Sequence, residues 1–276
     1  MVVRPLVLKF GGELLENPAH LASVVSAVKT VAARSGAVIV HGGGKEIDAA
    51  LRVAGLEKRQ IDGLRVTDER TLDVVVSVLA GNVNTRFVAA LNTAGVAAVG
   101  LTGADAACGL SSVAPPHRST DGREVDLERV GIPDAAADMR VLHTLVAGGF
   151  VPVVACIGLG HDGRLLNVNA DTLAGHLAAR LGARRMVVAG TTPGVLDERG
   201  ATLPVLEAAA VADLASGGTA TAGMIAKLRA CEHALAGGVD DVVIVDGRNA
   251  EALVSAAESD APSAATRMVK EAVVGR

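Results

Sequence analysis

The chain has 276 residues, half of them hydrophobic and a fifth charged, so it can bury a large core and is not an intrinsically disordered chain. Its net charge of −4 gives no electrostatic support for nucleic-acid binding, and its aromatic residues, three Phe without Tyr or Trp, offer no base-stacking platform. Residues 1–10 show no signal-peptide pattern, and three scattered cysteines fit a reducing compartment, so we expect a cytoplasmic protein.

Short apolar runs alternate along the chain with longer patterns of helical periodicity. The runs are apolar on both faces and predict strands of a buried parallel sheet at Leu6–Phe10, Ala37–His41, Ala97–Leu101, Val151–Ile157, Met186–Ala189 and Val242–Val245. The helical patterns cover Leu21–Arg34, Glu46–Ala54, Glu69–Ala94, Leu173–Leu181 and Ile225–Ala236, and a glycine follows most of them closely. This alternation predicts an α/β fold, a three-layer αβα sandwich with a mostly parallel central sheet.

One segment needs separate treatment because it could be mistaken for a membrane span. Val141–Gly160 contains no Asp, Glu, Lys or Arg and is long enough to cross a bilayer. Gly148, Gly149 and Pro152 interrupt it, so it is better interpreted as a helix end, a turn and a buried strand. We therefore expect no membrane partner.

The remaining segments suggest two lobes and one surface hairpin. Turn residues are frequent in Ala114–Asp126, which predicts a surface hairpin or loop. The chain turns again near His161–Asn167, and we place the lobe boundary there, giving lobes 1–165 and 166–276. The Ala-rich tail after Ala250 predicts a helix followed by a last strand or a loose end.

Two strands run directly into glycine clusters, Gly11-Gly12 after the first strand and Gly42-Gly43-Gly44 after the second. Glycines at a strand end allow a tight turn that aims backbone N–H groups at one point, which suits phosphate or carboxylate. A turn that merely links a strand to a helix explains each cluster equally well. The clusters are not a P-loop, because the lysine of that motif is missing. They are not a dinucleotide-binding fingerprint either, because the third glycine of that motif is missing.

Two lysines are candidates for stabilising a transferred phosphoryl group, a reaction that depends on cations around the moving charge. Lys9 ends the first strand and Lys227 follows Gly223-Met224. A lysine beside a glycine loop can equally be a solvated surface charge. Asp171 is similarly ambiguous, since it could simply cap a helix. No cluster with metal-ligand spacing is evident, so we expect no metal held by the protein alone.

The order of the motifs resembles the amino acid kinase family, with the carbamate kinase-like fold, and within it most closely the acetylglutamate kinase branch. The matching pieces, in the family's order across nearly the whole chain, are Lys9–Gly12, Val40–Gly44, Gly63–Asp68, Leu79–Asn84, Asn167–Asp171, Pro193–Leu196, Gly223–Leu228 and Asp246–Arg248. The segments Gly63–Asp68 and Asn167–Asp171 are the most specific of them.

The resemblance implies ATP-dependent phosphorylation of the side-chain carboxylate of N-acetyl-L-glutamate, in arginine biosynthesis, with Mg²⁺ accompanying the ATP. It implies an N-terminal lobe for the amino-acid substrate and for dimerisation, and a C-terminal lobe for ATP. The implied catalytic residues are Lys9, Lys227 and Asp171, with Asp171 holding both ammonium groups. The implied substrate-binding residues are Gly43, Gly44, Arg65 and Asn167, and the implied ATP-binding residues are Gly11, Gly12, Thr191, Pro193, Gly194 and Gly223.

Three positions depart from the family pattern. Glu13 stands where a small residue is usual and could place a carboxylate near phosphate, Lys45 replaces a common proline, and Thr191 replaces a usual aspartate. The resemblance also implies that the loop Gly217–Met224 contacts the nucleotide.

Two other functions remain open from the sequence. One is an acetylaminoadipate-type kinase of lysine biosynthesis, and the other is a catalytically silent amino-acid or nucleotide sensor. We expect a homodimer that contacts through the helix in Glu69–Ala94 and is insensitive to arginine, because the chain begins almost at its first strand.

Overall fold

The computed structural model describes residues 4–119, 121–197, 199–216 and 222–270. Its centre is an eight-stranded sheet in the order β14-β16-β15-β13-β1-β2-β10-β5. The strands are β1 (Leu6–Phe10), β2 (Ala37–His41), β5 (Ala98–Thr102), β10 (Val151–Ala155), β13 (Arg185–Gly190), β14 (Val205–Glu207), β15 (Asp241–Asp246) and β16 (Ala265–Val269). Neighbours pair in parallel except β15 with β16.

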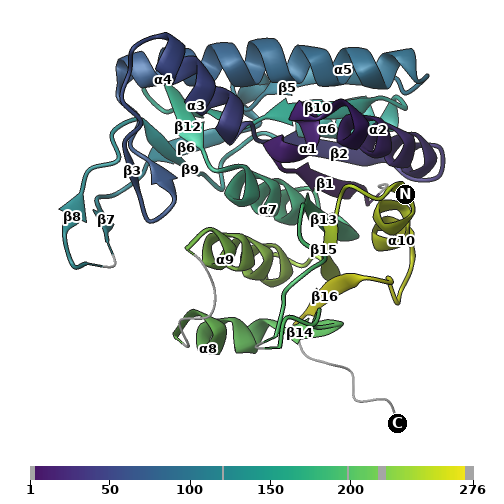
Figure 1. The fold of residues 1–276 in the computed structure, drawn as a ribbon. Helices are drawn as coiled ribbons and strands as arrows, with labels where there is room; N and C mark the ends of the chain where they lie inside the picture. The colour runs from purple at the N-terminus through teal and green to yellow at the C-terminus, as the bar shows by residue number, and fades with distance from the viewer. Residues whose placement is uncertain (1–3, 120, 198, 217–221, 271–276) are drawn as a thin grey trace.

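Helices cover both faces of this sheet (Figure 1). One layer contains α1 (Gly12–Glu16), α2 (Pro18–Ala32), α5 (Asn84–Thr93) and α10 (Ala250–Glu258), with α2 in contact with the other three. The other layer contains α6 (Arg140–Ala147), α7 (Ala170–Arg180) and α9 (Ala222–Ala236). The predicted three-layer α/β fold with a mostly parallel sheet is therefore confirmed.

A smaller set of strands forms a closed arrangement that the sequence analysis did not predict. It consists of β6 (Leu110–Val113), β9 (Val130–Pro133), β11 (Ile157–Gly160) and β12 (Leu165–Val168). The predicted strand Val151–Ile157 is wrong at its end, because the chain leaves the main sheet after Ala155 and enters the small one at Ile157. The proposed lobe boundary falls inside β12.

Two short hairpins extend from this region. β3 (Gln60–Ile61) pairs with β4 (Leu64–Arg65), and β7 (His117–Arg118) pairs with β8 (Glu124–Val125). The second projects from the body of the molecule (Figure 1), which confirms the hairpin predicted for Ala114–Asp126.

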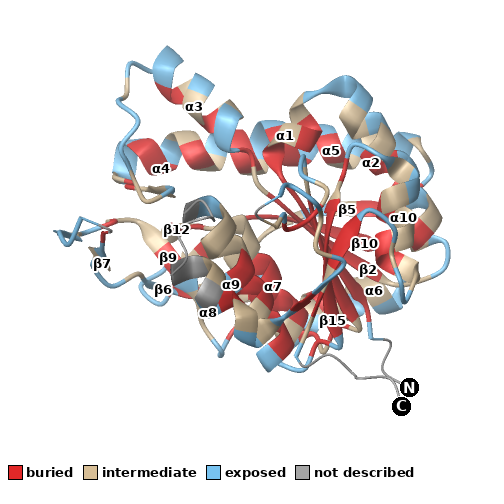
Figure 2. Cartoon of the chain, turned by 60° about the horizontal axis from the view of Figure 1, so that its bottom comes forward, coloured by how far each residue is buried: buried red, intermediate tan, exposed pale blue. Residues whose placement is uncertain are grey.

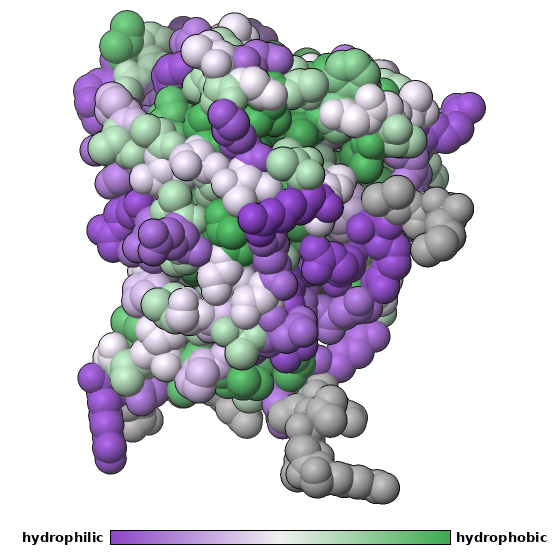
Figure 3. Space-filling view, turned by 90° about the vertical axis from the view of Figure 1, so that its right-hand side faces the viewer, coloured by the Kyte–Doolittle hydropathy of each residue, from purple (hydrophilic) through white to green (hydrophobic). Residues whose placement is uncertain are grey.

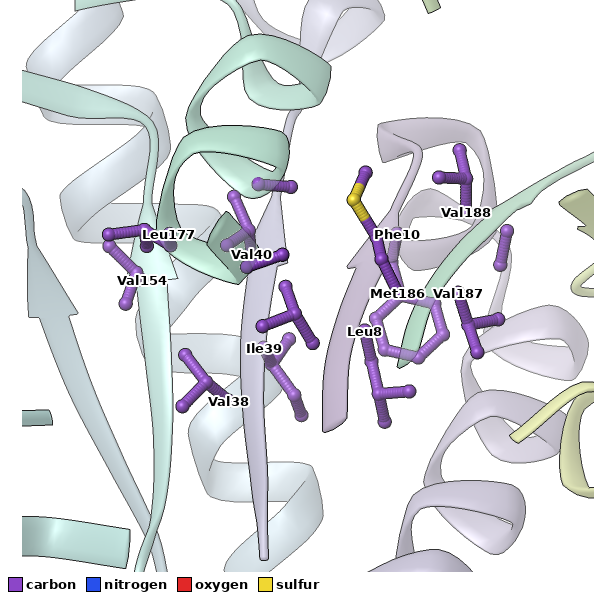
Figure 4. Close-up of a cluster of buried hydrophobic side chains, with 14 of the residues drawn as sticks. Leu8, Phe10, Val38, Ile39, Val40, Val154, Leu177, Met186, Val187 and Val188 are labelled. Carbon is purple, nitrogen blue, oxygen red and sulfur yellow. The ribbon is translucent and has the colours of Figure 1, made fainter. Parts of the chain in front are cut away.

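The core lies where the central strands meet the helices. Figure 4 shows side chains of β1, β2, β10 and β13 packed with Leu177 of α7, and Figure 2 shows the same strands as the buried centre of the fold. All residues of β1, β2 and β10 are buried, as predicted. The edge strand β5 differs, since only Ala98 is buried there. On the face drawn in Figure 3, apolar residues are interspersed with hydrophilic ones.

A continuous helical run, Glu69–Thr93, is long and apolar enough to cross a membrane by length and composition. It comprises α4 (Glu69–Val76), a π-helical turn (Ser77–Val83) and α5. The residues buried along it include Leu72, Leu79, Phe87 and Leu91, which is the pattern of a helix that packs one side on a protein core. The other segment of membrane-spanning length divides into α6, a turn and β10, as predicted.

Candidate active site

The two glycine clusters lie against each other at the carboxyl ends of β1 and β2. These strands pair in register, with Phe10 beside His41, so the chain leaves both at the same edge of the sheet. A β-carbon added to Gly12 would lie 2.6 Å from the Cα of Gly43, which only a residue without a side chain permits. The two loops are separate motifs in the sequence, and in the fold they form one surface.

The π-helical turn after α4 supports this surface from behind. A β-carbon on Gly43 would come within 2.8 Å of Leu79 Cδ2 and 3.3 Å of Val83 Cγ2, both from that turn. π-helical turns inside α-helices often occur at functional sites. The close packing fixes the position of the Gly43 backbone.

Asp171 lies between the two lysines singled out from the sequence. Its Oδ1 is 2.9 Å from Lys9 Nζ and 3.6 Å from Lys227 Nζ. Asp171 is not the cap of its helix, because the Asn169 side chain accepts hydrogen bonds from the Asp171 and Thr172 N–H groups. The Asp171 carboxylate is therefore available to both ammonium groups.

Burial and ion pairing together set the protonation of this triad. Burial raises the pKa of the Asp171 carboxyl, but Lys9 and Lys227 outweigh it and hold that pKa below its usual range. Burial lowers the pKa of Lys9, yet Asp171 raises it above the ordinary value. For Lys227, burial and repulsion by Lys9 dominate and lower the pKa. Lys227 is thus the less well compensated cation, and an added anion would stabilise its charge.

Arg65 is half-buried and ends the β3–β4 hairpin. Its Nη2 donates to Asp48 Oδ1 of α3 (Gly44–Val53) at 2.5 Å, and Asp48 also pairs with Lys58 at 2.7 Å. Its other terminal nitrogen, Nη1, is buried and has no hydrogen-bond partner. A buried guanidinium nitrogen without a partner is costly, and a bound carboxylate would satisfy it.

Asn167 lies on β12 beside the same space. Its Nδ2 donates to Thr67 Oγ1 at 3.0 Å, and Thr67 Oγ1 in turn donates to the Arg65 carbonyl. The hydrogen bond fixes the Asn167 amide relative to the segment that carries Arg65.

One cavity of about 280 Å³ brings most of the predicted site residues together. The residues that line it include Lys9, Gly11, Gly12, Glu13, Gly43, Gly44, Arg65, Leu79, Cys156, Asn167 and Asp171. Lys227 joins this group through Asp171. The lining thus combines the Lys9 ammonium group, a guanidinium nitrogen of Arg65 without a hydrogen-bond partner and glycine backbone, with Lys227 adjoining through Asp171, and this combination suits a small anion.

Of the predicted nucleotide-binding residues, Gly11 and Gly12 belong to that lining, and the other four lie outside it. Thr191 is exposed after the end of β13, and Gly194 has a φ of 134° and packs against β16, where its β-carbon would meet Thr266 Oγ1 at 2.4 Å. Pro193 lies between them and is half-buried. Gly223 is at the start of α9, and residues 217–221 of the predicted loop lie outside the described residues.

Sequence reasoning missed two contributors to this arrangement. Asp48 was not singled out, and nothing in its local sequence indicates that it pairs with Arg65. Asn169 was quoted only as part of a motif, although the pattern of a short polar residue just before a helix predicts its capping role.

Comparison with known proteins places this geometry in a family. Residues 4–246 match the model of the amino acid kinase family. An acetylglutamate kinase from Novosphingobium aromaticivorans is 38% identical over 263 residues, covering 91% of this chain and 86% of the relative. An acetylglutamate kinase from Methanopyrus kandleri is 40% identical over 243 residues, covering 87% of this chain and 94% of the relative.

Solved structures share the fold. N-acetylglutamate synthase from Neisseria gonorrhoeae, complexed with coenzyme A and N-acetyl-glutamate, has a TM-score of 0.82 and 25% identity over 98% of this chain. The chain spans 60% of that synthase's length. Giardia carbamate kinase, at 14% identity and a TM-score of 0.67 over 98% of this chain and 99% of its own, shows the fold alone.

Proposed function

The chain belongs to the amino acid kinase family, and from this premise we propose that it transfers the γ-phosphoryl group of ATP to the side-chain carboxylate of N-acetyl-L-glutamate, a step of arginine biosynthesis. The observation that carries the proposal is the Asp171 carboxylate between Lys9 and Lys227, at the cavity lined by Arg65. The similarity to acetylglutamate kinases over most of the chain supports the choice of acceptor.

The chemistry follows from the charges in this site. A carboxylate acceptor is ionised at neutral pH, so the reaction needs no general base. The carboxylate oxygen attacks the γ-phosphorus, the bond to the β-phosphate bridging oxygen breaks, and ADP leaves as the acyl phosphate forms. Lys9 and Lys227 stabilise the charge on the transferring group, and Asp171 keeps both in position.

The acceptor carboxylate is positioned by groups that need an anionic partner. Arg65 supplies its unpartnered Nη1 to a carboxylate of the substrate, and Asn167 orients the acetylated backbone. The Gly43 and Gly44 backbone groups face the substrate between the strand end and α3. All of these residues except Asn167 lie in 1–165, the lobe that we propose for substrate binding and dimerisation.

ATP is assigned to residues 166–276, together with the first glycine loop. Gly12 offers its backbone N–H group to the phosphates, and Gly11, whose own N–H donates to the Ala189 carbonyl at 3.1 Å, lets the chain turn beside them. Thr191, Pro193 and Gly194 follow β13, and Gly223 begins the helix that carries Lys227, so these residues flank the nucleotide.

Mg²⁺ is the metal proposed to accompany ATP, where it supplies positive charge to the phosphate oxygens. Among the residues that the structure describes, no group of three or more His, Cys, Asp or Glu could hold a metal ion. Mg²⁺ commonly binds one or two carboxylates and takes its remaining ligands from phosphate and water. Two carboxylates of the described chain line the cavity: Asp171 is paired with Lys9 and Lys227, and Glu13, beside the glycine loop, fits this requirement.

We further propose a cytoplasmic homodimer whose subunits contact each other through Glu69–Thr93. One side of this helix is buried against the core, and its composition is more apolar than that buried side alone requires. The three cysteines are free and buried, and burial raises the pKa of each thiol to about 12, in keeping with a reducing compartment.

An acceptor panel tests the proposal. ADP release is measured with acetylglutamate, acetylaminoadipate, glutamate and no acceptor, and we expect turnover with acetylglutamate far above the others. Preference for acetylaminoadipate would assign the chain to lysine biosynthesis. Nucleotide binding without turnover of any acceptor would identify a sensor.

A further inference from the structure

Glu13 places a carboxylate inside the proposed phosphate site. It is the second residue of α1, which follows β1 almost at once, and it lines the cavity with Lys9 and Gly12. A β-carbon on Gly11 would lie 2.3 Å from Glu13 Oε1 and 2.4 Å from Oε2, and a β-carbon on Gly190 would lie 3.4 Å from Oε1. The carboxylate therefore lies between the carboxyl ends of β1 and β13.

This carboxylate is not used by the fold. Within the described residues, its oxygens take part in no hydrogen bond and no ion pair, although its negative charge favours the charged forms of Lys9 and Lys227 as a minor contribution. Glu16, one turn further along α1, instead feels the charge of Lys45 and does not line the cavity. Glu13 is thus an uncommitted negative charge at a site built to receive a negative ligand.

The Glu13 carboxylate has the same sign of charge as the phosphate groups that the site is proposed to bind. A polyphosphate bound at Gly11 and Gly12 would be repelled by a carboxylate a few ångströms away, in a setting less polar than water. A divalent cation between the two reverses the sign of that interaction. Mg²⁺ readily combines one protein carboxylate with phosphate oxygens and water.

We propose that Glu13 is a direct or water-mediated ligand of the divalent metal ion that enters with the nucleotide, so that this site selects the metal–nucleotide complex over the free nucleotide. The inference rests on the proposed ATP site and not on the identity of the acceptor. Glu13 would contribute binding selectivity, whereas Lys9 and Lys227 stabilise the transferred group.

Calorimetric titration with ADP, in excess Mg²⁺ and in EDTA, tests this without any turnover. We expect wild-type protein to bind ADP more tightly with Mg²⁺. Glu13→Gln keeps the shape but removes the charge, so the Mg²⁺ enhancement should fall about tenfold or more, while metal-free ADP should bind more tightly than it does to wild type. A merely structural role would weaken binding in both conditions.

Controls separate the possible results. Glu16→Gln removes a carboxylate from the same helix and should keep the wild-type Mg²⁺ enhancement, and circular dichroism checks that each variant is folded. Glu13→Asp, which retains the charge on a shorter arm, should keep part of the enhancement; it also serves if Glu13→Gln fails to fold.

An unchanged Mg²⁺ enhancement in Glu13→Gln, or an equal loss in Glu16→Gln, would overturn the inference alone. Absence of ADP binding by wild-type protein in both conditions would overturn the proposed function together with it. A lost Mg²⁺ enhancement in Glu13→Gln supports the inference even if the acceptor panel identifies a substrate other than acetylglutamate.

Discussion

Gly12 and Gly43 come from loops that follow different strands, yet no side-chain atom fits between them: a β-carbon on Gly12 would sit 2.6 Å from the Gly43 Cα. Gly12→Ala must push the two loops apart and so displace the protein groups that bind ATP and acetylglutamate. We expect kcat/KM to fall about a hundredfold, the cost of misplacing reacting groups by an ångström or so.

Gly81→Ala is the matched control for this change. Gly81 lies in the π-helical turn with nothing within 4 Å of an added β-carbon, and alanine is the better helix former. Its kcat/KM should stay near the wild-type value. Equal activity of Gly12→Ala and wild type would contradict the assignment of the glycine loops.

Lys227→Met separates catalysis from stability. Removing a cation that acts on the transferring phosphoryl group should lower kcat about a hundredfold or more. The lysine is incompletely compensated, since burial and Lys9 lower its pKa, so its loss should leave the melting temperature unchanged or higher. Steady-state kinetics and thermal unfolding on one preparation measure kcat and the melting temperature. A normal kcat would refute the role of Lys227 in phosphoryl transfer.

Asp171→Asn, in contrast to Lys227→Met, should destabilise the folded protein. It leaves two buried ammonium groups facing each other without their counter-ion, which we expect to cost about 3–5 kcal/mol of unfolding free energy. Urea unfolding at neutral pH measures this. Addition of the Mg²⁺–nucleotide complex should restore part of the loss, because phosphate replaces the missing negative charge.

The substrate side is tested by Arg65→Lys. Lysine cannot provide both the Asp48 contact and a second donor for a carboxylate in the planar guanidinium geometry. We predict an increase of about tenfold or more in the KM for acetylglutamate, with the KM for ATP nearly unchanged. A parallel rise in both values would indicate general damage to the site.

Stability should also fall in mild acid because of two buried histidines. Burial lowers the pKa of His41 and of His176 to about 4, against an ordinary value of 6.5. The unfolded chain therefore takes up protons first, and the stabilisation, complete above pH 6.5, is lost as the pH falls towards 4, by up to about 1.4 kcal/mol per pH unit for each histidine.

Urea unfolding between pH 7 and 5 measures that slope. His176→Gln should reduce it by removing one of the two groups, whereas the same change at the exposed His161 serves as the control. A slope that is the same in wild type and His176→Gln would exclude His176 as a source.

The sequence predicted six strands of the main sheet because they are runs of mostly apolar residues. It did not predict the edge strand β14, which is three residues long and has only its central residue buried. It could not predict the small closed sheet, whose strands are short and contain Gly131, Gly158 and Gly160. No alternation of apolar and polar residues distinguishes such segments from loops.

The candidate site was predictable as a set of residues and not as a geometry. Lys9, Asp171 and Lys227 carry little signal alone, and only the order of motifs in the resemblance linked them. The Arg65–Asp48 ion pair joins different elements and leaves no local pattern. Glu13 was noted as unusual, but the direction of its carboxylate depends on how α1 leaves β1.

The strand order has a consequence for how the protein is made. β1 emerges first from the ribosome, yet one of its two neighbours in the sheet, β13, belongs to the last third of the chain, and Lys227 follows later still. Until then the nascent chain carries an open apolar strand edge, the kind of surface that chaperones shield. We therefore expect phosphoryl transfer only once synthesis is almost complete, and we expect chains that end before α9 to be inactive because they lack Lys227.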